Sequence, residues 1–171
     1  RNREEKGIEK FFSKNKIQFD IGSLLKPQSG YRMPKNSLRK KLTRQEQRDL
    51  DIEISFLEGL LRRDPEYVEA LQILGDDYTK RGMVEEGLKV DQKLSQLRPK
   101  DPLVYYNLAC SYSLAGELEL AVEALEKALM LGYRDFRWMA RDPDLRKLRL
   151  SPLYKKIRNK IRTLRYRKVS S

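Results

Sequence analysis

A pattern of residues recurs along the chain with an offset of 34 positions. It contains a large residue, a Leu followed by a small residue, an aromatic residue and a Gly. The matching pairs are Leu71 with Tyr105, Leu74-Gly75 with Leu108-Ala109, Tyr78 with Tyr112, Gly82 with Gly116, Gly87 with Ala121, Leu94 with Ala128, and Pro65 with Pro99. A fixed period of about 20–50 residues is typical of stacked units, none of which buries its apolar face alone. The chain is therefore predicted to fold as a short array of repeated units.

This pattern resembles the tetratricopeptide repeat (TPR), a helical hairpin of about 34 residues. The resemblance implies an all-α fold, a short right-handed superhelix of about two complete repeats with capping half units. It also implies a surface for binding protein rather than an active site, so we expect a non-enzymatic adaptor or scaffold. Gly75 is expected to be small because another helix crosses there, and Tyr78 is expected to fill the space between the two helices. Asp91 departs from the family pattern, in which a large apolar or aromatic residue is usual.

The repeat domain is predicted to cover residues 43–150. Thr43 and Glu46 have the spacing of a capping box, in which each side chain bonds the backbone N–H of the other residue. After it, apolar residues at helical spacing predict an amphipathic helix that replaces part of a first repeat, and they are Leu50, Ile54, Leu57 and Leu61.

The stretch after the second repeat resembles the capping segment that closes many bacterial TPR arrays. The resemblance rests on Asp142-Pro143-Asp144-Leu145, Leu148-Arg149 and Ser151-Pro152-Leu153-Tyr154. We expect Asp142 to cap a short helix that begins at Pro143, and Leu145 and Leu148 to cover the last repeat. Phe136 and Trp138 are expected to help seal that end as core residues.

Charge is unevenly distributed along the 171 residues, whose net charge is +12. Residues 1–48 hold 14 Lys and Arg against 5 Asp and Glu, and residues 136–171 hold 13 against 2. Residues 49–135 hold 10 against 18, so an acidic middle separates two basic ends. Such asymmetry indicates an anionic partner for the ends, while the alternative is that they are solvated tails.

The basic ends are predicted to be an extended arm at residues 1–42 and an amphipathic helix and tail at 151–171. The apolar face of that helix is expected to contain Leu153, Ile157, Ile161 and Leu164. Candidate contacts with the anionic partner are Arg39, Lys40, Lys41, Lys155, Lys156, Arg158, Lys160, Arg162, Arg165, Arg167 and Lys168. Candidate anchors of the arm are Phe11, Phe12, Phe19 and Tyr31, which pack either on the chain's own repeats or on a partner.

A groove on the first helices of the two repeats is the candidate protein-binding site. Its predicted lining is Gln72, Asp76, Lys80, Asn107, Ser111 and Leu114. The acidic bias of this lining favours a basic peptide or helix. Asn107 stands at a matching position of the clamp with which some TPR proteins hold a C-terminal carboxylate, but Gln72 and Asp76 do not fit that clamp.

Catalytic and metal-binding patterns are not found in the sequence. It contains no histidine and one cysteine, Cys110, which we expect to be a small packed thiol. Adjacent residues diverge by about 100° around a helix, so Asp76 and Asp77 are not expected to share one site, and we predict a solvated or concave-face role for the pair. We therefore expect no enzyme activity, no cofactor and no small-molecule substrate.

Neither a run of about 18 apolar residues nor a signal-peptide core is visible, so we expect a cytoplasmic or organelle-matrix protein. The chain begins with Arg1 rather than Met, which fits a fragment or a processed form and makes an absent targeting signal weak evidence.

Two hypotheses for the partner stay open. In the first, the chain is an adaptor in an RNA-containing assembly such as a ribosome, and its basic ends contact phosphates. In the second, it is a protein-only scaffold or assembly factor, and its basic ends bind an acidic protein or an anionic membrane surface. Both share the protein-binding repeat domain.

Overall fold

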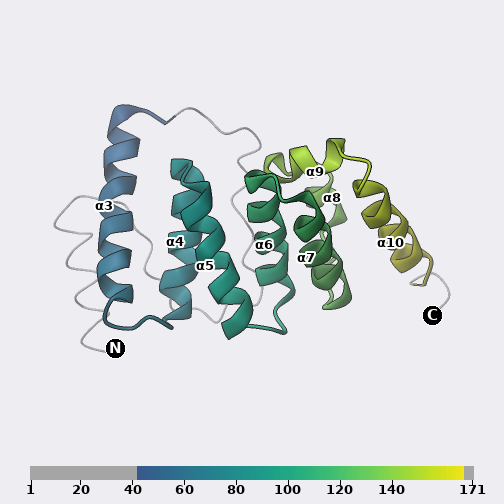
Figure 1. Cartoon of the computed structure of the whole chain (residues 1–171), viewed down its shortest axis with the longest axis horizontal. Helices are drawn as coiled ribbons and strands as arrows, with labels where there is room; N and C mark the ends of the chain where they lie inside the picture. Colours follow the sequence, from purple (N-terminus) through teal and green to yellow (C-terminus); the bar gives the residue numbers. More distant parts are fainter. Residues whose placement is uncertain (1–41, 168–171) are drawn as a thin grey trace. The chain divides into compact units, whose positions relative to one another are not determined.

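The computed structural model describes residues 42–167, and within this range every regular element is a helix (Figure 1). The elements are α3 (Arg44–Leu61), α4 (Val68–Arg81), α5 (Val84–Leu97), α6 (Pro102–Ala115), α7 (Leu118–Met130), α8 (Phe136–Met139), the 3-10 helix η1 (Pro143–Leu145), α9 (Arg146–Leu150) and α10 (Tyr154–Arg167). The predicted arm at residues 1–42, with its anchors Phe11, Phe12, Phe19 and Tyr31, lies outside the described residues apart from Leu42.

Local sequence signals set the start of α3. The backbone N–H of Glu46 donates to the Thr43 Oγ1 atom at 3.2 Å, and the N–H of Thr43 donates to a Glu46 carboxylate oxygen at 2.7 Å. The predicted capping box is thus confirmed. Leu50, Ile54 and Leu57 form the buried stripe of the helix, as their spacing predicts.

The two hairpins turn at glycines that are 34 residues apart. Gly82 follows α4 with a φ of 85°, and Gly116 follows α6 with a φ of 90°. This left-handed region suits glycine because it has no Cβ atom. In both turns the next residue donates its N–H back to a tyrosine carbonyl, from Met83 to Tyr78 at 2.8 Å and from Glu117 to Tyr112 at 3.0 Å.

The α4–α5 hairpin is closely packed because both helices carry a glycine at their contact. A Cβ atom on Gly75 would lie 3.3 Å from Val90 Cγ1, and one on Gly87 would lie 3.3 Å from Thr79 Oγ1. The small size of Gly75 therefore has the predicted cause, a crossing helix. Gly87, which has low helix propensity, permits the same close approach from the other side.

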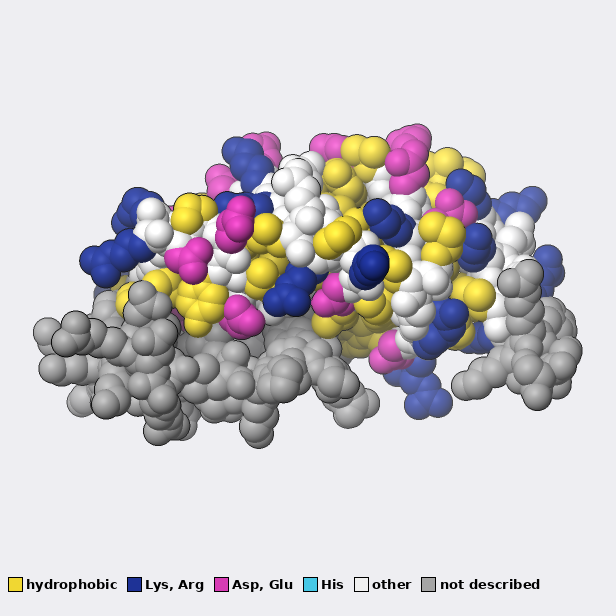
Figure 2. All heavy atoms as spheres, turned by 90° about the horizontal axis from the view of Figure 1, so that it is seen from below, with side chains coloured by type: hydrophobic (Ala, Val, Ile, Leu, Met, Phe, Trp, Pro, Cys, Tyr) yellow, Lys and Arg dark blue, Asp and Glu magenta, His cyan; other side chains and the backbone are white. Residues whose placement is uncertain are grey.

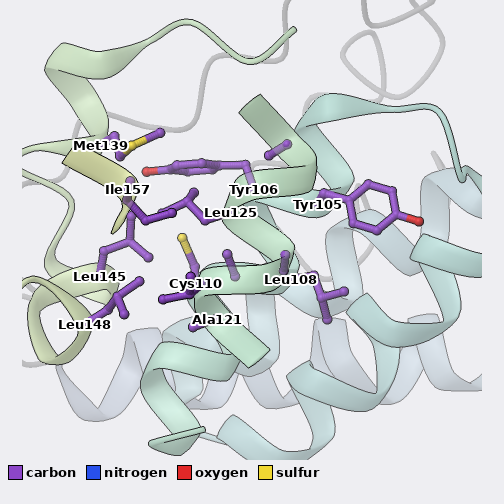
Figure 3. Close-up of a cluster of buried hydrophobic side chains, with 14 of the residues drawn as sticks. Tyr105, Tyr106, Leu108, Cys110, Ala121, Leu125, Met139, Leu145, Leu148 and Ile157 are labelled. Carbon is purple, nitrogen blue, oxygen red and sulfur yellow. The ribbon is translucent and has the colours of Figure 1, made fainter. Parts of the chain in front are cut away.

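Each helix packs on the next from α3 to α7, so the hairpins stand side by side (Figure 1). Leu74 and Tyr78 are buried between α3 and α4 with the α3 stripe. A separate buried cluster links α4, α5 and α6, and it consists of Leu71, Leu94 and Val104. A larger cluster joins α6 and α7 to the C-terminal elements (Figure 3).

The segment after α7 closes the end of the stack. Asp142 accepts a bond from the Asp144 N–H at 2.9 Å and caps η1, in which Pro143 is the first residue. Leu145 and Leu148 are fully buried against α6 and α7, as predicted (Figure 3). Phe136 and Trp138 are partly buried against the same cluster, which agrees with their predicted role as core residues.

Helix α10 packs on α7 and α9 through one face. Ile157 is fully buried, and Ile161 and Leu164 are partly buried against the main cluster. The prediction that Leu153 belongs to this face is wrong, because the helix begins at Tyr154 and Leu153 is 37% exposed. Leu153 instead donates its N–H to the Ser151 Oγ atom within the turn, and Tyr154 takes the buried position.

Candidate functional site

The predicted groove residues lie on α4 and α6. Gln72, Asp76 and Lys80 follow one another at intervals of one turn on α4; the first two are half-buried and Lys80 is exposed. Asn107 and Leu114 are half-buried on α6. Helix α5 packs against both α4 and α6, so these residues belong to neighbouring hairpins.

Ser111 does not fit the predicted groove lining. It is 3% exposed, and its hydroxyl donates to an Asp91 carboxylate oxygen at 2.5 Å. This bond joins α5 to α6 inside the stack, so Ser111 is not available to a ligand. It also explains the departure from the family pattern at Asp91, because the carboxylate has a buried partner in the next hairpin.

Asp76 and Asp77 share one partner, contrary to our prediction for an adjacent pair. The Lys80 Nζ atom lies 2.7 Å from Asp76 Oδ2 and 3.0 Å from Asp77 Oδ1. Positions three and four residues before a lysine both lie on its side of a helix, so one flexible ammonium reaches both. Asp77 is only 1% exposed and is therefore not a solvated residue.

A third carboxylate, Glu53 on α3, joins this group. Burial, and then the nearby Asp77 and Asp76 carboxylates, raise the pKa of Glu53 to about 7, although Lys80 opposes the shift. Burial likewise raises the pKa of Asp77 to about 6 despite its bond to Lys80. We call Glu53, Asp76, Asp77 and Lys80 the acidic cluster.

Two contacts hold α3 against α4 beside the acidic cluster. The Tyr78 hydroxyl donates to a Glu58 carboxylate oxygen at 2.6 Å, and Arg81 forms an ion pair with Asp51 at 2.6 Å. Asp51 and Glu58 are seven residues apart and lie on one flank of the buried stripe of α3, whereas Glu53 lies on the other flank. Spacing alone could have indicated this, because Glu53 is three residues after Leu50 and four before Leu57 on the buried stripe.

Two buried acceptor atoms on α4 and α6 lack a hydrogen-bond donor within the part of the chain that the structure describes. They are Asp77 Oδ2 and Asn107 Oδ1. Buried polar atoms in native proteins are almost always paired, so each of these atoms needs an explanation.

Most basic side chains of α10 are exposed. Lys160 is half-buried, and the exposed basic residues are Lys155, Lys156, Arg158, Arg162 and Arg165. Lys156 pairs with Glu126 on α7 at 2.9 Å, and the Arg165 guanidinium lies 5.3 Å from the centre of the Phe136 ring. Figure 2 shows Lys and Arg side chains gathered toward this end of the described stack.

Other predicted basic contacts lie beyond what can be described. Arg39, Lys40, Lys41 and Lys168 are outside the described residues, and Arg167 is the last residue of α10, without a described side chain. In contrast, Lys147 and Arg149 of α9 bond backbone carbonyls. Lys147 bonds that of Leu114 on α6, and Arg149 bonds those of Met139 and Asp142 within the capping segment. These two cations are therefore part of the cap.

Cys110 lies in the core, as predicted. It is buried among apolar side chains (Figure 3), its Sγ atom lies 3.7 Å from an Asp142 carboxylate oxygen, and burial raises the pKa of its thiol. A raised thiol pKa opposes nucleophilic reactivity at neutral pH. Across residues 42–167, no three His, Cys, Asp or Glu side chains are placed to hold a metal ion, and no helix has the length and apolarity to cross a membrane.

Comparison with known proteins gives partial matches, while no family model matches the chain. A stretch of 93 residues, 53% of this chain, is 34% identical to a protein of Arabidopsis thaliana that is named as chloroplastic, and it covers 26% of that protein. A stretch of 86 residues, 50% of this chain, is 36% identical to "Superkiller protein 3" of Saccharomyces cerevisiae and covers 6% of it. The chain thus spans a small part of the length of these relatives. Together with the all-helical stack, both matches are consistent with a TPR-like protein.

Proposed function

We propose that this chain is a non-enzymatic adaptor whose helical stack binds a protein and whose basic ends bind an anionic partner within a larger assembly. The stack is a short right-handed TPR superhelix with its binding face on α4 and α6. The domains are the arm at 1–42, the repeats at 43–150 and the basic helix and tail at 151–171.

The main support for this proposal is the separation of the basic ends of the chain from its acidic middle. The exposed cations of α10 project from a helix whose apolar face is already buried, so apolar membrane insertion would require undocking. Phosphate groups of RNA are suited to such a row of exposed cations. We therefore favour RNA of a ribonucleoprotein as the anionic partner.

A protein-only scaffold is the second candidate. The pair between Lys156 and Glu126 shows that α10 cations bond carboxylates within this chain, and an acidic protein face presents the same groups. A location in the cytoplasm or an organelle matrix is compatible with either partner, and the chloroplastic name of one relative agrees with an organelle.

Affinity capture of the full chain, with and without nuclease, tests the proposal. A variant with Arg158, Arg162 and Arg165 replaced by Ala serves as the comparison, since these side chains are exposed. Partners that depend on both RNA and the three arginines support the RNA adaptor. Partners that survive nuclease but require the arginines support the protein-only scaffold, and partners unaffected by either change contradict a role for α10.

A further inference from the structure

The acidic cluster holds more negative than positive charge when all its groups are ionised. Glu53, Asp76 and Asp77 are three carboxylates, and Lys80 is the cation that bonds two of them. Burial works against the Lys80 cation, but the attraction of the two aspartates outweighs it and raises its pKa. The cluster therefore has capacity for a second positive charge.

One carboxylate oxygen in the cluster is buried and unsatisfied. Asp77 Oδ1 accepts from Lys80, whereas Asp77 Oδ2 has no donor among residues 42–167. The free Asp77 oxygen is an acceptor, so a complementary ligand must be a donor; a guanidinium offers five N–H donors and an ammonium three, each with a positive charge.

We propose that Glu53, Asp76 and Asp77 form a subsite for an arginine or lysine side chain of a basic protein segment, and that Lys80 occupies this position in the unbound chain. This inference rests on the proposed function, because it requires that α4 and α6 bind a protein partner. The incoming cation displaces the Lys80 ammonium, whose side chain is 46% exposed and free to move into solvent. It then bonds the buried Asp77 carboxylate together with Glu53.

Binding at this subsite releases a proton. The charged groups of α4 that act on Glu53 are Asp76, Asp77 and Lys80. On α5, the Asp91 carboxyl in turn interacts electrostatically with Asp76. Because the pKa of Glu53 is about 7, a large share of this side chain is protonated at neutral pH. A cationic ligand favours the ionised form, so affinity rises from about pH 6 to about pH 8.

Isothermal titration calorimetry of the full chain with short peptides tests the subsite. The probes are tetra-arginine, tetra-lysine and tetra-citrulline, the last being a neutral relative of arginine. We expect tetra-arginine or tetra-lysine to bind at least about tenfold more tightly than tetra-citrulline near pH 8. The better cationic probe identifies the preferred side chain.

Variants separate the subsite from general attraction to an acidic surface. Glu53→Gln and Asp77→Asn should each weaken cationic peptide binding by about fivefold or more, while Glu119→Gln, an exposed residue of α7, should leave it unchanged. Lys80→Met should strengthen binding, a gain that misfolding cannot imitate. Equal binding of citrulline, equal loss in Glu119→Gln, or weaker binding in Lys80→Met would overturn the proposal.

The outcome is independent of the identity of the natural partner. Failure of the peptide titration with successful capture of a protein or RNA partner contradicts only the subsite. Specific peptide binding supports the subsite even when affinity capture contradicts the role of α10.

Discussion

The buried Asp91 carboxylate predicts how stability depends on pH. Asp91 is 6% exposed, and burial raises its pKa from 3.8 to about 7 even though the Ser111 hydroxyl stabilises the ionised form. The folded protein therefore holds a proton at Asp91 that the unfolded chain releases near pH 4. Stability from this group is fully present below about pH 4 and falls as pH rises toward about 7.

The magnitude follows from the two pKa values. Each pKa unit corresponds to about 1.4 kcal/mol, so the full penalty on the ionised side chain is on the order of 4 kcal/mol. By pH 5 roughly a third of this penalty is already present, and by pH 8 nearly all of it is. Asp91→Asn removes the ionisation and keeps an oxygen for the Ser111 hydroxyl. Its stability relative to the parent should therefore rise by roughly 2–3 kcal/mol between pH 5 and pH 8.

Urea denaturation at several pH values measures this difference. Glu53 and Asp77 also have raised pKa values, so the parent alone would report their sum, whereas the difference between parent and variant isolates Asp91. Glu119→Gln, which changes an exposed residue of α7, is the matched control and should show little pH-dependent difference. A difference between Asp91→Asn and the parent that stays constant from pH 5 to pH 8 would refute the reasoning.

Three further predictions test the turn, the cap and α10. Gly116→Ala should destabilise the fold by about 1 kcal/mol because the φ of Gly116 is 90°, although nothing lies within 4 Å of the new Cβ atom. Gly59→Ala within α3 should instead stabilise it by up to about 1 kcal/mol. Urea denaturation measures both changes, and a change of the same sign in the two variants would contradict the backbone argument. Leu148→Ala should cost about 2–5 kcal/mol in the same assay, because this side chain is fully buried; a loss below about 1 kcal/mol would show that the cap adds little. For single-stranded RNA, replacing Arg158 and Arg162 by Ala should reduce the slope of log K against log salt by about 1.4, and an unchanged slope would exclude contacts by these residues.

Local and repeated features were predictable from the sequence. The offset of 34 residues predicted the two hairpins, because Gly82 and Gly116 are needed wherever the backbone enters the left-handed region. The capping box at Thr43 and the cap at Asp142 were predictable for a similar reason. Each depends on neighbours within a few residues, which the sequence displays directly.

The acidic cluster was only partly predictable. The place of Asp76 and Lys80 on the first repeat predicts that they lie together on one face of α4, but it does not predict the burial of Asp77 or the approach of Glu53. Their burial depends on how α3 approaches α4, which involves residues more than twenty positions apart. Carboxylates are usually found on the surface, which argues against a buried Glu53. The spacing of Glu53 from Leu50 and Leu57 nevertheless places it next to the buried stripe of α3.

Helix α6 shows why such polar positions matter for the whole stack. It is buried on several sides, and its polar side chains bond to the elements on both sides of it. Toward α5, the Ser111 hydroxyl donates to Asp91. Toward the capping segment, the Tyr106 hydroxyl donates to Asp142 at 2.6 Å, and the Ser113 hydroxyl donates to the Asp144 carbonyl at 2.7 Å. Apolar contacts tolerate sliding between helices, but these directional bonds are satisfied at one register only. They thus fix the position of α6 relative to α5 and to the capping segment. The geometry of the proposed binding face consequently depends on buried hydrogen bonds on either side of α6, as well as on the residues that line that face.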